Sequence, residues 1–169
     1  MNVIEYYEQS LRDRGFKPDS AQRRAAESLQ VFYDEWSVYL SIRSNRVTRF
    51  LRHPTIPRSV YLWGGVGRGK SFLMDAFYNT VPLKRKTRVH FHEFMRSVHR
   101  ELEDVKGTAN PLDEVAQRIS RRYRLICFDE FHVSDIADAM ILYKLLLGLY
   151  KNGTAFVMTS NYEPCTLYP

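Results

Sequence analysis

The sequence predicts an α/β fold in which helices flank a parallel sheet. The first observation behind this prediction is an apolar run at 60–63, which leads into a glycine-rich turn and then into a helical pattern. The second is the run 125–128, whose apolar residues are typical of a strand buried on both faces of a parallel sheet. A third apolar run at 154–158 follows another helical pattern, so predicted strands and helices alternate along the chain.

The chain of 169 residues is expected to divide into residues 1–58, a helical segment with a basic linker, and residues 59–169, the α/β core. Helical patterns cover 2–14 and a longer stretch for which Asp19 or Ser20 is the candidate cap. In this second helix apolar residues recur at steps of three and four, which predicts one buried face. The residues of that face are Ala25, Leu29, Phe32 and Trp36.

Two basic stretches interrupt the predicted elements. Residues 41–58 are interpreted as a linker or exposed arm, and two alternatives stay open: a solvated loop, or a patch that binds an anion or a partner. Its arginines are Arg43, Arg46, Arg49, Arg52 and Arg58. The second run, 84–88, leads into a predicted strand at 88–91, which helices at 92–104 and 112–123 follow. The exposed face of the helix at 112–123 is expected to carry Arg118, Arg121, Arg122 and Arg124.

The glycine-rich turn matches the phosphate-loop pattern G-x-x-x-x-G-K-[ST]. Glycines let the backbone turn tightly and aim several N–H groups into one concavity. A helix that begins near Lys70 adds free N–H groups and a positive dipole end at the same place. Lys70 is expected to reach the β and γ phosphates of ATP, and the Ser71 hydroxyl to ligate Mg²⁺. A loop that binds nothing is the alternative, but composition makes a chance match rare. The expected nucleotide-binding residues are Gly64, Gly65, Val66, Gly67, Arg68, Gly69, Lys70 and Ser71.

An acid pair, Asp129 and Glu130, comes directly after the apolar run 125–128. Ligands of open α/β sheets bind at the carboxyl ends of the strands. Carboxylates at a buried strand end are costly unless a cation or a proton neutralises them, and Mg²⁺ bound to phosphates would supply that cation. We therefore expect Asp129 to serve Mg²⁺ and Glu130 to polarise a water molecule for attack on the γ-phosphate.

Polar residues also follow the third apolar run, as Thr159-Ser160-Asn161. Asn161 is expected to hold the attacking water or to sense the γ-phosphate, and a simple cap of the strand end is the alternative. Between the acid pair and Asn161, Ser134 is the candidate cap of a helix at 135–150. The buried face predicted for this helix consists of Ile136, Met140, Tyr143, Leu146, Leu147 and Tyr150.

The composition narrows the classes of partner. A net charge of +6 suits a nucleotide, nucleic acid, an acidic protein surface or an anionic membrane, although a soluble domain with one basic face explains it equally well. Cys127 and Cys165 lack metal-ligand spacing, and His90, His92 and His99 match no zinc pattern, so free thiols and no zinc site are expected. No apolar run is long enough to cross a bilayer, and no signal layout opens the chain, so a cytoplasmic location is expected.

Together these motifs resemble an AAA+ ATPase and, more narrowly, the AFG1-like ATPases. The phosphate loop is shared by many families, whereas the other matching stretches are more specific. Those stretches are Val89-His90-Phe91-His92-Glu93-Phe94-Met95, Phe128-Asp129-Glu130-Phe131, Ser134-Asp135-Ile136-Ala137-Asp138-Ala139-Met140, Thr159-Ser160-Asn161 and Leu167-Tyr168-Pro169. The resemblance implies ATP bound by Gly64 to Ser71, Mg²⁺ served by Asp129, Glu130 as catalytic base and Asn161 as the sensing polar residue.

The resemblance also implies a role. Bacterial members of the family act in cell division, so ATP hydrolysis linked to a protein partner such as the division-ring filament is expected, at the division site and in a homo-oligomer of the full-length protein. AAA+ modules usually continue into an arginine finger, a fifth strand and a helical lid, which this sequence does not reach. Without an arginine finger, weak hydrolysis is expected. Without a fifth strand, the strand at Tyr61 is expected to lie on an open edge of the sheet. Two alternative functions stay open: a helicase-loader-like protein that binds DNA, and a nucleotide-binding module without turnover.

Overall fold

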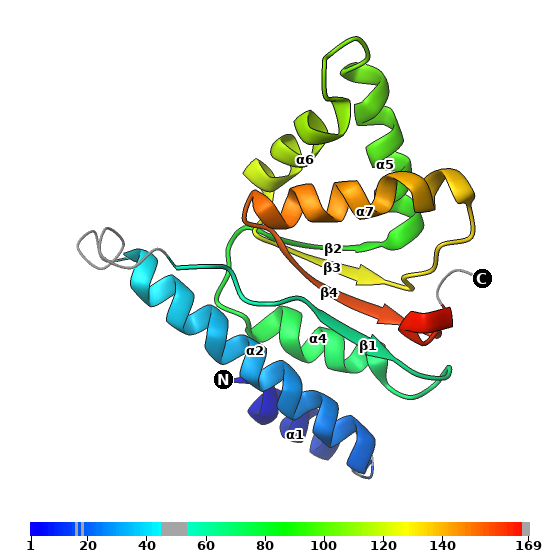
Figure 1. Ribbon diagram of the computed structural model, residues 1–169. Coiled ribbons are helices and arrows are strands. Elements are labelled where there is room, and N and C mark those ends of the chain that lie inside the picture. The colour runs from blue at the N-terminus through cyan, green and yellow to red at the C-terminus, as the bar shows by residue number, and fades with distance from the viewer. Residues whose placement is uncertain (16, 18, 45–53, 167–169) are drawn as a thin grey trace.

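The computed structural model describes residues 1–15, 17, 19–44 and 54–166, and it shows a parallel sheet between two layers of helices (Figure 1). The sheet has the strand order β1-β4-β3-β2, and every pair of neighbours is parallel. The strands are β1 (Val60–Trp63), β2 (Lys86–His90), β3 (Leu125–Asp129) and β4 (Ala155–Ser160). The predicted fold class, a parallel sheet flanked by helices, is therefore confirmed.

Each face of the sheet has its own apolar core. Helices α1 (Val3–Arg14), α2 (Ser20–Ser44) and α4 (Lys70–Thr80) cover one face, and α5 (Phe91–Asp104), α6 (Pro111–Arg122) and α7 (Ile136–Lys151) cover the other (Figure 1). Alternate residues of β3 point into the two cores: Leu125 and Cys127 join the first, Ile126 and Phe128 the second. All four side chains are fully buried, as the apolar run predicted for a central parallel strand.

Capping residues lie at both ends of α1 and at the start of α2. Asn2 and Glu5 form a reciprocal capping box on α1, and Gly15 ends that helix with a φ of 65°. The Asp19 carboxylate accepts a hydrogen bond from the Ala21 N–H at 2.8 Å and so caps α2. The predicted face of α2 is buried at Leu29, Phe32 and Trp36, while Ala26 takes the core position expected of half-buried Ala25. Of the basic stretch 41–58, residues 45–53, with Arg46, Arg49 and Arg52, lie outside the described residues.

The predicted strand at 88–91 is shifted. β2 begins at Lys86 and ends at His90, and Phe91 is already the first residue of α5. The Phe91 side chain packs in the second core, with its ring centroid 4.4 Å from that of Phe131. A buried aromatic residue at a strand-to-helix junction fits either element by pattern alone, which is why the boundary was misplaced.

The predicted buried face of α7 is wrong. The residues that face the core are Leu142, Leu145 and Leu149. The predicted set is exposed at Ile136, Met140, Tyr143, Leu147 and Tyr150, and half-buried at Leu146. The helix carries two apolar stripes at helical spacing, and the close approach of α6 selects one of them: a Cβ added at Gly148 would lie 3.0 Å from the Ala116 Cβ. The helix is capped by the Asp135 side chain, which accepts from the Ala137 N–H, and not by Ser134.

Among the described residues β1 pairs only with β4, so the opposite edge of β1 is open, as the sequence predicted. Trp63 at the end of this strand is 54% exposed. Among all the residues that the structure describes, no helix is both long and apolar enough to span a bilayer. Helices connect every pair of successive strands, so the carboxyl ends of β1, β3 and β4 meet at one edge of the sheet.

Candidate functional site

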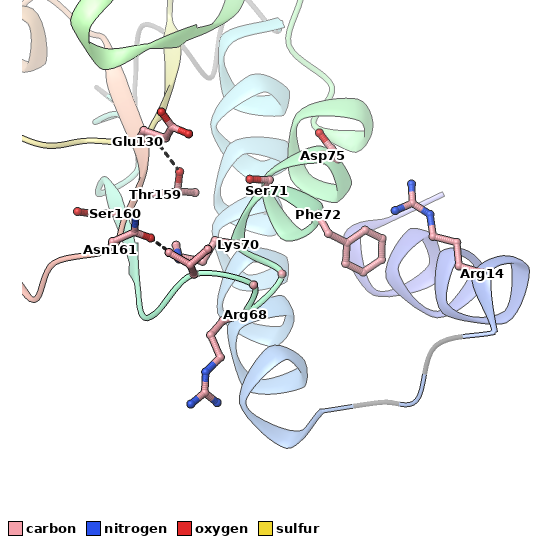
Figure 2. Close-up of a pocket in the computed structure, with 13 residues that line it drawn as sticks. Arg14, Arg68, Lys70, Ser71, Phe72, Asp75, Glu130, Thr159, Ser160 and Asn161 are labelled. Carbon is pink, nitrogen blue, oxygen red and sulfur yellow. Dashed lines mark hydrogen bonds between the residues drawn. The ribbon is translucent and has the colours of Figure 1, made fainter.

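A cavity of about 460 Å³ lies at this edge of the sheet, within the usual range for small-molecule sites (Figure 2). The phosphate loop and the start of α4 form one wall, and the carboxyl ends of β3 and β4 form another. The lining residues are Arg14, Val66, Gly67, Arg68, Gly69, Lys70, Ser71, Phe72, Asp75, Glu130, Thr159, Ser160 and Asn161. The structure thus brings most of the predicted site residues together, although the segments that carry them lie far apart in the sequence.

The backbone of the phosphate loop requires its glycines. Gly67 and Gly69 both have a φ of 78°, in the left-handed region that glycine adopts without strain. A Cβ at Gly69 would also lie 2.7 Å from the Gln22 amide nitrogen, because α2 packs closely behind the loop and Gln22 donates a hydrogen bond to the Arg68 carbonyl. Gly69 precedes α4, and no side chain caps the first turn of that helix. Its free N–H groups are therefore available to an anion.

Lys70 is folded back onto the loop. Its ammonium group donates to the carbonyls of Gly64 at 2.6 Å and Gly65 at 2.8 Å, and to the Asn161 side-chain oxygen at 2.9 Å (Figure 2). Burial lowers the pKa of Lys70. Among the described residues its hydrogen-bond acceptors are all neutral, so phosphate oxygens would give it stronger, charge-assisted hydrogen bonds.

Glu130 is held in a strained backbone conformation at the mouth of the cavity. Its φ of 55° makes it the one non-glycine residue with a left-handed backbone among those described. The Glu130 N–H donates to the Thr159 hydroxyl at 3.3 Å, which ties the turn after β3 to the end of β4 (Figure 2). The carboxylate itself is 76% exposed, and His90 Nδ1 lies 3.8 Å from it. Its solvated position suits contact with a water molecule.

Asp129 is not among the residues that line the cavity. Its carboxylate is 13% exposed and is paired with Arg88, whose Nε lies 2.6 Å from Oδ2 and whose Nη2 lies 3.3 Å from Oδ1. Arg88 also donates to Asp75, which does line the cavity. Burial alone would lower the pKa of Arg88, but the hydrogen bonds and charges of the two aspartates outweigh it and raise that pKa.

Sequence reasoning missed Arg14, Phe72, Asp75 and Arg88. Asp75 could have been found, because it stands four residues after Ser71 and so shares a face of the same helix. Arg14 belongs to α1 and lies over the Phe72 ring, with 5.4 Å from its guanidinium carbon to the ring centroid (Figure 2). No pattern within α1 marks this residue, because its place at the cavity depends on how α1 packs against α4.

The residues near the cavity fit a magnesium ion. The Ser71 hydroxyl and the carboxylates of Asp75 and Asp129 are oxygen donors, which Mg²⁺ prefers. Within the described part of the chain no group of three or more histidine, cysteine, aspartate and glutamate residues forms a preformed metal cage. This sparse donor set is typical of Mg²⁺ that is held mainly by substrate phosphates and water.

A phosphate loop that opens a helix after β1, with an acid pair at the end of β3 in the same parallel sheet, defines a P-loop NTPase. The fold agrees: AMPPCP-bound DnaA from Aquifex aeolicus has a TM-score of 0.55 at 17% identity, over 91% of this chain and 43% of that one. The chain belongs to the AFG1-like ATPase family, whose profile matches residues 1–169.

Two relatives show how far the similarity extends. The cell division protein ZapE of Escherichia coli strain K12 is 40% identical over 96% of this chain and 46% of its own length. Lactation elevated protein 1 homolog B of Danio rerio is 46% identical over 69% of this chain and 25% of its own. The chain thus spans less than half the length of these relatives.

Proposed function

We propose that this chain binds ATP with Mg²⁺ at the phosphate loop and hydrolyses it. The observation that carries the proposal is the cavity itself, in which the start of α4, Lys70, Glu130 and Asn161 converge. Its volume of about 460 Å³ and its concave, N–H-lined wall suit a nucleoside triphosphate. Membership of the AFG1-like ATPase family supports the same conclusion.

Each side chain then has a defined task. The uncapped N–H groups of α4 bind the phosphates, and Lys70 exchanges the carbonyls of Gly64 and Gly65 for phosphate oxygens. Ser71 and Asp129 would hold Mg²⁺, which neutralises the charge that develops on the phosphates during transfer.

Glu130 accepts a proton from the attacking water, and its exposed carboxylate is free to do so. Asn161 leaves Lys70 when phosphate arrives and orients that water or the γ-phosphate. These residue roles remain predictions.

The partner is proposed to be a protein. The similarity to the cell division protein ZapE supports a role in cell division, and the resemblance to the AFG1-like ATPases favours the division-ring filament as substrate. In the full-length protein we expect this work to be done by a homo-oligomer, because an arginine supplied by a neighbouring subunit raises phosphoryl-transfer rates by about 10³- to 10⁵-fold.

DNA binding is a weaker candidate on this structure. Arg85 and Arg124 lie together at the sheet edge opposite the cavity, where a basic groove would suit a nucleic acid. Their guanidinium groups are already used: Arg85 donates to the Ser120 carbonyl at 2.7 Å, and Arg124 to the Gly153 carbonyl at 3.2 Å. Both arginines therefore bind backbone carbonyls at or just after the carboxyl ends of helices, which leaves them less available to the phosphates of a nucleic acid.

The test is phosphate release from ATP, measured for the parent chain and for Glu130→Gln, with ATP binding measured on the same samples. We expect slow release by the parent, and ATP binding without release by Glu130→Gln. Glu163→Gln, which changes an exposed carboxylate outside the cavity, is the matched control and should behave as the parent does. Equal release by parent and Glu130→Gln would contradict the proposed role of Glu130, and binding without release by the parent would select the module without turnover.

A further inference from the structure

Arg88 connects the acid pair to the helix that follows the phosphate loop. It projects from β2 and donates hydrogen bonds to both oxygens of Asp129 on β3 and to Asp75 on α4. Its side chain is only 25% exposed, so this cation is placed between two carboxylates in a largely enclosed position. Nothing in the nucleotide motifs requires an arginine at this point.

The strand register explains why these groups meet. His90 stands opposite Asp129 in the parallel pair β2–β3, and Arg88 stands opposite Cys127. Arg88 therefore points to the same face of the sheet as Asp129, which is the face that α4 covers. On α4, Asp75 lies one turn beyond Ser71, so Ser71 and Asp75 share the side of the helix that faces the cavity.

The pairing fixes the orientation of a carboxylate that would otherwise rotate. A bidentate arginine pair holds both oxygens of Asp129 in one plane, and Asp75 in turn holds the guanidinium. A lysine at this position is a compact point charge and reproduces neither the two-point contact with Asp129 nor the bridge to Asp75. Partners of this kind in the outer shell of a metal site change metal affinity or activity by about 10- to 100-fold when they are removed.

We propose that Arg88 is a positioning residue for magnesium: it orients Asp129 toward the ion held beside Ser71, and Asp75 anchors Arg88 in that orientation. The inference rests on the proposed function, because it concerns the Mg²⁺ that accompanies the nucleotide. It assigns a role to Arg88 and Asp75, neither of which belongs to the phosphate loop or the acid pair. On this proposal Arg88 acts on the ion only through Asp129.

The readout is a ratio: the affinity for a non-hydrolysable ATP analogue measured with MgCl₂, divided by the affinity measured with a chelator. This ratio isolates the contribution of the metal, because the loss of a positive charge near the phosphates affects both measurements. The variants are Arg88→Met, Arg88→Lys and Asp75→Asn. Arg100→Met is the matched control, since Arg100 is exposed on α5 and lies outside the cavity.

For Arg88→Met we expect the affinity ratio to fall by about 10-fold or more, with chelator affinity within about threefold of the parent. Arg88→Lys should not restore the ratio, Asp75→Asn should lower it less than Arg88→Met does, and Arg100→Met should leave it unchanged. Thermal unfolding of each variant identifies any that fails to fold. If Arg88→Met fails to fold, Arg88→Lys, which keeps the charge but not the two-point contact with Asp129, carries the test.

Three results would overturn the inference. An unchanged ratio in folded Arg88→Met, or equal losses with and without MgCl₂, would leave Arg88 a purely structural role. A higher ratio would show that Arg88 competes with the cation for Asp129. The absence of analogue binding by the parent would reject the proposed function as well, and this outcome is distinct because it appears before any variant is compared.

Discussion

The Lys70 ammonium group lies 2.9 Å from the Asn161 side-chain oxygen, although the two residues are separated by 91 positions in the chain. The contact joins the phosphate loop after β1 to the end of β4 (Figure 2). In this arrangement the cation that is expected to bind phosphate is occupied by a neutral amide. On the proposed function, phosphate would compete with Asn161 for this ammonium group, which would couple the arrival of phosphate to the position of the Asn161 side chain.

Asn161→Ala tests that coupling. We expect ATP affinity to stay within about threefold of the parent, because Lys70 gains phosphate oxygens in either protein. Phosphate release should fall by about 10-fold or more, since a group that orients the reacting atoms is lost. The measurement is single-turnover release at saturating ATP, with Asn79→Ala, an exposed amide on α4, as the control. Release at the parental rate would show that Asn161 only caps the strand end.

Glu130→Gly tests the strain at the acid pair. Glycine adopts a φ of 55° freely, so this variant should raise the free energy of unfolding by about 1 kcal/mol and abolish phosphate release. Glu130→Gln, which keeps the strain, should abolish release with no such gain. Urea unfolding of the three proteins provides the comparison. Equal stability of the Gly and Gln variants would contradict a strained backbone at this residue.

The local motifs were predicted from the sequence because their signals are local. Turn glycines, a capping residue and apolar runs located the phosphate loop, the start of α2 and the buried strand β3. The face of α7 could not be predicted, because its sequence carries two apolar stripes and only the packing of Gly148 against Ala116 distinguishes them. The pairing of Arg88 with Asp129 depends on strand register and on α4, which no single stretch encodes.

Two substitutions on α7 test the corrected face. Leu145 is fully buried, so Leu145→Ala should lower the free energy of unfolding by about 2–5 kcal/mol. Met140 is 73% exposed, so Met140→Ala should change it by less than about 0.5 kcal/mol. Urea denaturation of both variants measures the difference. A larger loss for Met140→Ala than for Leu145→Ala would reverse the assignment of the two faces.

Cys127 predicts a loss of stability at high pH. Burial raises the pKa of this thiol to about 12, whereas an exposed thiol titrates near about 8.5. Between these values the unfolded chain has lost the proton that the folded chain keeps, so stability present below about pH 8.5 is lost as pH rises, by about 1.4 kcal/mol per unit. From pH 8 to 10.5 the parent should therefore lose about 2.5 kcal/mol more than Cys127→Ala, as measured by urea unfolding. Parallel losses in the two proteins would show that the thiol does not contribute.

The proposed function requires the cavity beside Lys70 to be a nucleotide site. The most direct measurement is equilibrium binding of ATP with MgCl₂ to the parent chain and to Lys70→Ala, with circular dichroism on the same samples. We expect saturable binding by the parent and a loss of at least about 10-fold in affinity for the variant, because the charge-assisted contacts of Lys70 are removed. A folded parent that binds no ATP, or equal binding by the folded variant, would contradict the proposed function.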